Sequence, residues 1–168
     1  RSQHSAQQWI AAAKSDMASN KVAENPIPPF HLAFPVRDVQ EARDFYTGIL
    51  GCTEGRRAAT WCDFNFFGHQ VVVHLVKGYL ASNTANAVDG DAVPVPHFGC
   101  VLTVDAFHAF AARLKAVPGF EFIIQPHLRF KGAPGEQWTM FFKDPSQNAL
   151  EFKAMTTPGN LFAQYHVE

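Results

Sequence analysis

The feature that most constrains the fold of this chain is an order of predicted elements that occurs twice. A strand-like run over residues 30–36 precedes a helical pattern that begins at Asp38, and a pair of strand-like runs follows. A second strand-like run over residues 97–104 precedes a helical pattern that begins at Asp105, and strands follow again. Because a repeated supersecondary unit sets the whole architecture, such a repeat has to be recognised first. The order predicts two βαβββ modules.

A single offset between the two halves supports this repeat. The offset places Trp61 on Trp138 and His74 on Glu151. The segment between the halves is rich in Ala, Asn, Asp, Gly and Pro, which is typical of a linker. The predicted parts are an N-terminal arm over residues 1–29, a first module over 30–77, a linker over 78–96, a second module over 97–155 and a C-terminal tail over 156–168.

The composition excludes several classes of protein. Apolar residues make up 47% of the chain, which excludes wholesale disorder. The 14 Lys and Arg nearly balance the 15 Asp and Glu, so there is no basic excess to favour nucleic acid or an anionic membrane as a partner. Nowhere do about 20 apolar residues run together, as a membrane-spanning helix requires. We therefore expect a small molecule as the partner.

The three cysteines bear on the redox compartment. Cys52, Cys62 and Cys100 form no C-x-x-C motif, so we expect reduced thiols rather than a disulfide framework or a structural zinc site. This usage favours a cytoplasmic or organellar interior. The chain starts at Arg1 rather than Met, so we expect that the N-terminus is incomplete and that it reveals no targeting segment.

Alternation along the predicted strands brings polar side chains to one face of each module. His31 shares a face with the small residue Ala33, and His97 shares a face with Gly99, which leaves room in front of each imidazole. A carboxylate at Glu151 lies between apolar neighbours, where it needs a cation or a hydrogen-bond donor.

If the two modules face each other, the polar residues of their first and last strands converge. Two imidazoles and a carboxylate with open coordination positions form the facial set that binds non-haem Fe(II), and such a set also accepts other divalent metals. The prediction is therefore an α+β fold of two βαβββ modules that form a cupped mixed sheet around a metal site. The converging residues are His31, His74, His97 and Glu151.

At this point the sequence resembles the vicinal oxygen chelate superfamily, which includes glyoxalase I, extradiol dioxygenases, methylmalonyl-CoA epimerase, and fosfomycin and bleomycin resistance proteins. The resemblance covers about residues 30–155 and departs from the usual glycine at Gln147. The motifs that carry it are His31-Leu-Ala-Phe-Pro-Val-Arg-Asp38, Ala42-Arg-Asp-Phe-Tyr-Thr-Gly-Ile-Leu-Gly51 and Phe141-Phe-Lys-Asp-Pro-Ser-Gln-Asn-Ala-Leu-Glu151.

The resemblance implies that His31, His97 and Glu151 are metal ligands. Position 74 usually holds Glu in glyoxalase-like members and Gln in epimerase-like members, so His74 is expected to be either a fourth ligand or a catalytic base. Many two-module members dimerise, and a homodimer is therefore expected. The metal is expected to be divalent, with Fe(II) favoured over Zn, Ni, Co or Mn.

Three functions remain open. The first is an Fe(II) extradiol-type dioxygenase that uses O2 on a small substrate with vicinal oxygens, although no Tyr precedes Glu151 at the usual distance and four modules are commoner in that class. The second is a glyoxalase- or epimerase-like lyase or isomerase that uses Zn, Ni or Co, which suits a chain of two modules. The third is a small-molecule-binding resistance protein, which the metal ligands argue against.

Two further groups are predicted to contact the substrate. Asp63 and Asn65 share a strand face with Trp61 and are expected to line the pocket. The second group lies in a predicted loop before the last strand pair, where cations favour recognition of an anionic group. It consists of His127, Arg129 and Lys131.

Overall fold

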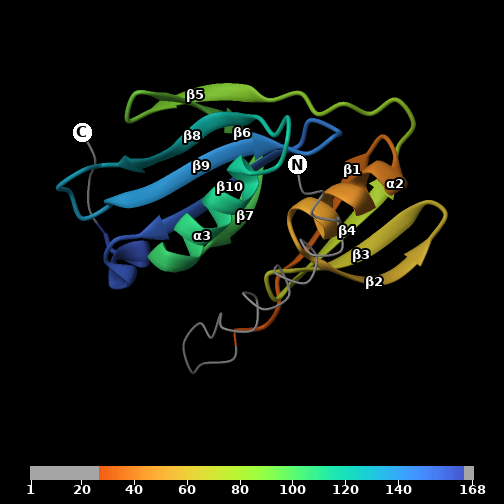
Figure 1. Cartoon of the computed structure of the whole chain (residues 1–168), viewed down its shortest axis with the longest axis horizontal. Coiled ribbons are helices and arrows are strands. Elements are labelled where there is room, and N and C mark those ends of the chain that lie inside the picture. The colour runs from red at the N-terminus through yellow and green to blue at the C-terminus, as the bar shows by residue number, and fades with distance from the viewer. Residues whose placement is uncertain (1–26, 165–168) are drawn as a thin grey trace, which may run out of the picture. The chain divides into compact units, whose positions relative to one another are not determined.

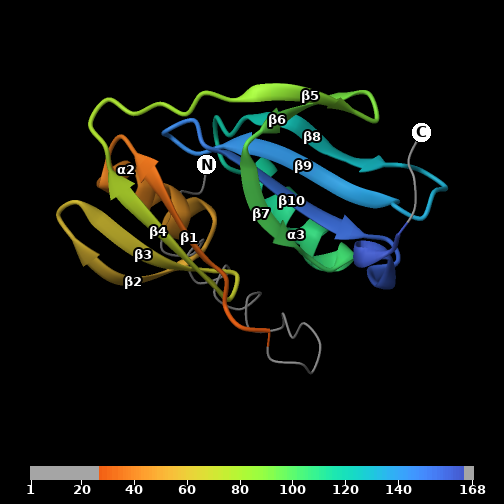
Figure 2. The same cartoon turned by 180° about the vertical axis from the view of Figure 1, so that it is seen from behind.

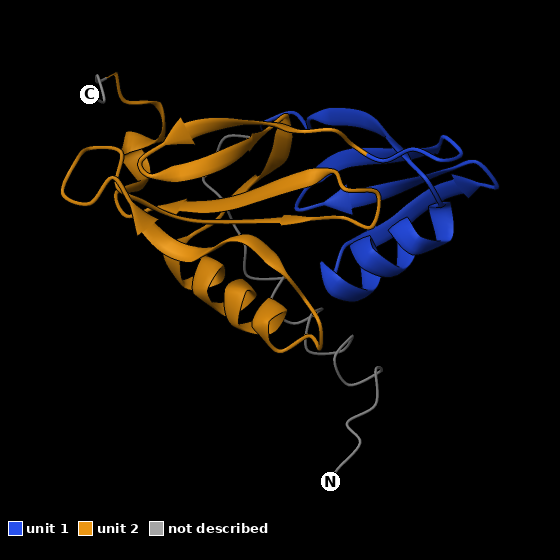
Figure 3. Cartoon of the chain, turned by 90° about the horizontal axis from the view of Figure 1, so that it is seen from above, with its two compact units in different colours: residues 1–80 blue, residues 81–168 orange. Residues whose placement is uncertain are grey.

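The computed structural model describes residues 27–164, and most of the predicted N-terminal arm lies outside this range (Figure 1). The chain divides into two compact units, residues 1–80 and residues 81–168 (Figure 3). Among the described residues, no helix is long and apolar enough to cross a membrane.

Unit 1 contains one mixed four-stranded sheet in the order β1-β4-β3-β2. Its first and last strands, β1 and β4, pair in parallel, and the remaining pairs are antiparallel. Its elements are β1 (His31–Val36), α2 (Val39–Arg43), η2 (Asp44–Ile49), β2 (Thr53–Ala58), β3 (Trp61–Phe66) and β4 (His69–Leu75).

Unit 2 repeats this arrangement with a sheet in the order β7-β10-β9-β8. The first and last strands of the repeat, β7 and β10, again pair in parallel. The predicted α+β fold of two βαβββ modules is therefore confirmed. The elements are β5 (Thr84–Val88), β6 (Asp91–Val95), β7 (His97–Val101), α3 (Val104–Lys115), β8 (Phe122–Arg129), β9 (Gln137–Lys143), β10 (Ala149–Met155) and η3 (Pro158–Phe162).

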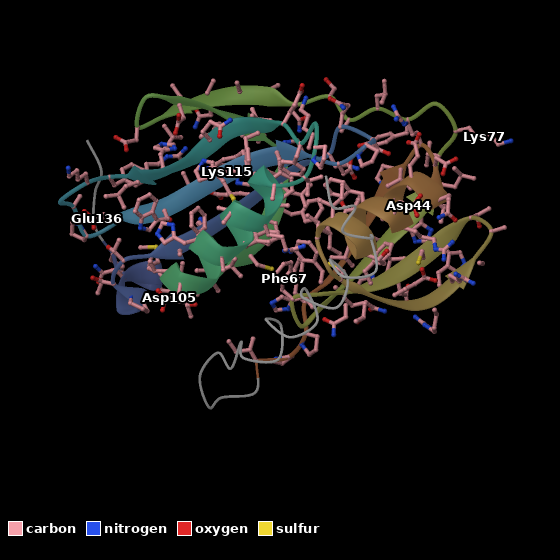
Figure 4. The ribbon with its side chains drawn as sticks, in the orientation of Figure 1. Asp44, Phe67, Lys77, Asp105, Lys115 and Glu136 are labelled. Atoms are coloured by element: carbon pink, nitrogen blue, oxygen red, sulfur yellow. The ribbon has the colours of Figure 1, made fainter. Side chains whose placement is uncertain are left out.

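Local capping explains where the helices begin. The side chain of Asp38 accepts a hydrogen bond of 2.9 Å from the backbone N–H of Glu41, as the sequence predicts. In unit 2 the cap is Thr103 and not Asp105, which lies in the first turn of α3. Figure 4 labels Asp105 and Lys115 at the two ends of this helix, where their charges complement the helix dipole.

In each unit, helical residues cover one face of the sheet with aromatic side chains. The buried ring of Tyr46 stacks on Phe64 with centroids 5.2 Å apart, and Phe110 of α3 meets Phe152 of β10 at 4.7 Å. Figures 1 and 2 show α3 in front of the unit 2 strands in one view and behind them in the other. The opposite face of each sheet therefore carries the polar residues of the first and last strands.

Strand register corrects the predicted correspondence between the halves. Trp138 packs against His108 of α3, with centroids 4.5 Å apart, so it lies on the helix side of its sheet. Trp61 lies in register with His74 on the other face of the unit 1 sheet. The two tryptophans are therefore not equivalent, because the single offset ignores the face on which each residue lies.

Strand register also shows which residue of unit 1 corresponds to Glu151. Glu151 pairs with Gly99, two residues after His97 in β7. In unit 1 the residue that pairs with Ala33, two residues after His31, is Val72. Val72 and not His74 is the counterpart of Glu151.

The segment predicted as a linker contains regular structure. Strands β5 and β6 form an antiparallel hairpin within unit 2, and both views place it beside β8 (Figures 1 and 2). Val93 of the hairpin packs in one buried cluster with Ile124 and Phe141. The hairpin is therefore part of the unit 2 core, and it forms because its apolar residues find partners that lie far away in the sequence.

The cysteines are free thiols, as predicted. Cys52 and Cys62 are buried, and Cys100 is half-buried. Burial raises the pKa of the Cys62 thiol to about 11 and that of Cys100 to about 12. These two thiols are therefore protonated and unreactive at neutral pH.

A substitution at Gly99 tests how strongly the site depends on the pairing of β7 with β10. A Cβ at this position would overlap the backbone carbonyl oxygen of Glu151. We expect Gly99→Ala to lower the free energy of unfolding by about 1–3 kcal/mol, the range for overpacking. Thermal or urea denaturation measures this change.

Gly48 offers the matched control. It lies in η2, and nothing stands within 4 Å of an added Cβ. Gly48→Ala should leave stability unchanged or raise it by about 0.5–1 kcal/mol, because alanine restricts the unfolded chain. Equal effects of the two substitutions would contradict the close approach at Gly99.

Candidate functional site

The polar face of unit 2 carries a histidine–carboxylate pair. The Nε2 atom of His97 in β7 lies 3.3 Å from Oε2 of Glu151 in β10. The hydroxyl of Thr139 donates a hydrogen bond of 2.9 Å to the other oxygen, Oε1. The Nζ atom of Lys153 lies 3.6 Å from Oε2 on the same face. Glu151 is 8% exposed and thus has the donors and the cation that the sequence analysis requires of it.

The electrostatics of the pair favour the charged forms of both groups. Burial acts to raise the pKa of Glu151, but His97, Lys153 and the Thr139 hydroxyl together lower it below its usual value. The hydrogen bond with Glu151 raises the pKa of His97, burial opposes this, and the carbonyl of Pro94 adds to it. The site is therefore a carboxylate that attracts positive charge, as a cation-binding site requires.

A backbone contact fixes the orientation of the His97 ring. Its Nδ1 atom lies 2.6 Å from the carbonyl oxygen of Pro94. A carbonyl oxygen can only accept, so Nδ1 carries the proton and Nε2 is the nitrogen that faces Glu151. The ring of Phe141 packs edge-on against the imidazole at a centroid distance of 5.2 Å.

The geometry of this pair fits a divalent metal. Two ligands about 2.1 Å from one ion at neighbouring coordination positions lie about 3 Å apart. The separation of 3.3 Å between Nε2 of His97 and Oε2 of Glu151 matches this spacing. Within residues 27–164, no group of three or more His, Cys, Asp or Glu side chains is placed to hold a metal ion.

In unit 1, His31 is held by a neighbour on the adjacent strand. His31 and Gln70 are register partners of β1 and β4, and Nδ1 of His31 lies 2.8 Å from Oε1 of Gln70. The side-chain amide of Gln70 in turn donates to Asp63 over 3.2 Å. Asp63 also pairs with Arg56, whose Nη2 lies 2.9 Å from the same carboxylate oxygen.

His74 lies away from this arrangement. It is exposed at the end of β4, in register with Pro35, four residues beyond the position that pairs with His31. Four residues of strand span about 13 Å. Imidazole ligands lie about 2 Å from their ion, so this register sets His74 apart from His31. The role of His74 as a fourth ligand or as a base stays a prediction.

Asp63 and Asn65 line a hollow in unit 1, together with Arg56, His69 and Gln70. Its volume is about 340 Å³. Asn65 uses its side-chain oxygen to accept a hydrogen bond of 2.8 Å from the N–H of Gly68. Whether the hollow takes a substrate stays a prediction.

The predicted cationic loop has a different setting from the one expected. His127 and Arg129 lie in strand β8, and Lys131 is exposed just beyond it. Arg129 is 3% exposed and pairs with Asp91 of the hairpin at 2.6 Å, while Nε2 of His127 lies 3.0 Å from the same carboxylate. Asp91 therefore neutralises the guanidinium of Arg129. This ion pair joins the hairpin to the sheet.

Four residues that contact the predicted site residues were not predicted from the sequence. Thr139 and Asp91 have partners that are distant in sequence, whereas Lys153 lies two residues from Glu151 in the same strand. Gln70 contacts His31 only because β1 and β4 pair in parallel. The alternation of strand residues already places Gln70 on the face opposite His69, and Lys153 on the same face as Glu151. It does not reveal which residue of another strand lies opposite.

Comparison with known proteins identifies the family. The family model described as the Glyoxalase/Bleomycin resistance protein/Dioxygenase superfamily matches residues 29–152. The chain belongs to this superfamily. No curated protein matches the chain by sequence.

Solved structures agree with this assignment. A glyoxalase/bleomycin resistance protein/dioxygenase from Alicyclobacillus acidocaldarius is 33% identical with a TM-score of 0.70, and the match covers 83% of this chain and 100% of that one. The fosfomycin resistance protein FosX from Listeria monocytogenes is 19% identical with a TM-score of 0.59, covering 82% and 100%. A virulence protein from Salmonella typhimurium is 18% identical with a TM-score of 0.54, covering 80% and 100%. The two more distant likenesses show the fold alone.

The pair of Arg129 and Asp91 generates a stability prediction. Asp91→Asn removes the charge that faces a buried guanidinium, so we expect the free energy of unfolding to fall by about 3 kcal/mol. The double substitution Asp91→Asn with Arg129→Met should recover most of this loss, because no unpaired charge stays buried. Denaturation of the two variants measures the difference, and equal instability would argue against the charge pair as the cause.

Proposed function

We propose that this chain is a metal-dependent enzyme of the superfamily in which His31, His97 and Glu151 are ligands of a divalent metal. The observation that carries the proposal is the pair of His97 and Glu151, whose facing atoms have the spacing of two ligands on one ion. His31 enters through its place in the first strand of the other module. Its Nδ1 is engaged by Gln70, which leaves Nε2 for coordination, as in His97.

We further propose that the reaction is an Fe(II)-dependent dioxygenation of the extradiol type. A set of two histidines and one carboxylate leaves coordination positions open, which favours non-haem iron and oxygen chemistry. The counterpart of Glu151 in unit 1 is Val72, which supplies no ligand. A glyoxalase-like set with a fourth polar group at that position is therefore less well supported.

The metal, when bound, would hold and polarise two vicinal oxygens of the substrate. The residues of the chain would do the remaining work. Thr139 keeps the carboxylate of Glu151 oriented, and Phe141 confines the ring of His97. Lys153 adds a positive charge on the same face, which would favour a substrate oxygen that carries negative charge.

A glyoxalase- or epimerase-like lyase or isomerase is the second candidate. The observation that favours it is the presence of two modules, because extradiol dioxygenases commonly have four. Zn, Ni or Co would be the metal in this case. A resistance protein that only binds a small molecule is the third candidate, and the proposed ligand set argues against it. The homodimer stays a prediction.

The decisive measurement is elemental analysis of protein purified anaerobically without added metal. We expect about one iron per chain, and activity on catechol-like substrates with consumption of O2. Zinc, nickel or cobalt in place of iron would support the lyase or isomerase, and no metal would contradict both enzyme functions.

His97→Ala should lose the metal while far-UV circular dichroism stays unchanged, and a variant with full occupancy would exclude His97 as a ligand.

His74 provides the matched control for the loss of an imidazole. Because strand register separates it from His31 by about 13 Å, His74→Ala should keep the metal content of the wild type. Turnover measured in the same sample tests the predicted role of His74 as a base. Loss of metal in this variant would contradict the register argument.

A further inference from the structure

We propose that Asp63 and Gln70 form a positioning relay that decides which nitrogen of His31 is available as a ligand. The inference rests on the proposed role of His31 in metal binding. The inference can be tested separately from metal binding, because it concerns the tautomer of the imidazole in the protein without metal. Asp63 thereby has a role as a positioning residue, and its predicted contact with the substrate is not needed for this role.

The carboxylate of Asp63 is almost fully buried, at 6% exposed. An ionised carboxylate can only accept hydrogen bonds. The side-chain atom of Gln70 that lies 3.2 Å from it must therefore be the NH2 group. The orientation of the amide follows from this one contact.

The orientation of Gln70 then determines the state of His31. With its NH2 group turned to Asp63, Gln70 presents Oε1 to His31 at 2.8 Å. A carbonyl oxygen accepts, so Nδ1 of His31 must be the donor. Nε2 is left with its lone pair, which is the form that binds a metal.

The local backbone makes this relay possible. Gln70 and Asp63 are diagonal neighbours on one face, because Gln70 pairs with Asn65 and Asp63 pairs with Val72. Strand β2 has an irregularity of register between Glu54 and Arg57, and Arg56 within it reaches Asp63. Gly55 leaves room there, because a Cβ would lie 3.2 Å from Cβ of Asp63.

In both modules Nδ1 of the histidine has an oxygen partner, but the two partners differ in kind. In unit 2 the acceptor for Nδ1 of His97 is the carbonyl oxygen of Pro94, a backbone atom that cannot turn around. In unit 1 the acceptor is a side-chain amide, which can present either end. Only the amide needs a further group to orient it, and this explains a buried carboxylate at Asp63.

A purely structural role for Asp63 explains less. The side chain of Arg56 is 77% exposed, and an ion pair with an exposed arginine contributes little to stability. Burial of the carboxylate is costly and needs partners. The amide of Gln70 is the second partner, and its orientation decides which end of the amide faces His31.

The test reads the His31 tautomer directly by two-bond 1H–15N correlation spectra at about pH 8.5 in metal-free protein, where an ordinary histidine is neutral. The wild type should show Nδ1 protonated. Asp63→Ala frees the amide to turn, and Gln70→Leu removes the acceptor, so each should shift His31 toward the Nε2-protonated form. Metal affinity should fall about 10–100-fold in both, the usual effect of losing such a partner.

A rescue variant separates the relay from general damage. In Asp63→Ala with Gln70→Glu, the side chain at position 70 has only acceptor oxygens and needs nothing to orient it. The double variant should restore the Nδ1-protonated form. Glu54→Ala is the matched control, because it removes a carboxylate from the same strand pair on the helix side of the sheet, and it should leave the His31 tautomer unchanged.

The outcomes distinguish the relay from the proposed function. An Nε2-protonated His31 in the wild type, or one tautomer in all variants, would overturn the relay whatever the metal content. A wild type that binds no metal but shows the expected tautomers would overturn the metal function and leave the relay standing. The resonances of His97 serve as an internal reference, because its acceptor is a backbone atom that none of the variants changes.

Discussion

The parallel pairing of the first and last strands of each module is the constraint on which the rest depends. It brings His97 beside Glu151 in unit 2 and His31 beside Gln70 in unit 1, although these partners are separated by the whole length of a module. The pairing in unit 2 is close enough that only glycine fits at position 99. A residue that forced β7 away from β10 would therefore separate the two atoms that face each other in the candidate site.

Buried charge follows a common rule in both units. Glu151, Asp63 and Arg129 are each almost fully buried, and each has an oppositely charged side chain within about 4 Å. In the candidate site the partner of Glu151 is an imidazole, which a metal can replace as the source of positive charge. The pair of Arg129 and Asp91 has no such alternative, and it fastens a hairpin to the sheet.

The two modules share a topology but not a chemistry. The polar face of unit 2 has a histidine, a carboxylate and a lysine, whereas the corresponding position of unit 1 holds Val72. This asymmetry gives each module a separate role in the proposed function. Unit 2 supplies most of the charge, and unit 1 supplies one oriented imidazole with its supporting amide.

The sequence by itself predicted the first strand, the helix and the last strand pair of each module, and the residue types of the proposed ligand set, because alternation and capping are local properties of the chain. Tertiary structure decided which residues lie opposite each other. A shift of register changes every partner without changing the pattern, so His74 looked equivalent to Glu151 although Val72 holds that place. The hairpin of β5 and β6 and the contacts of Asp91 and Gln70 depend on strands distant in sequence, and no local pattern encodes them.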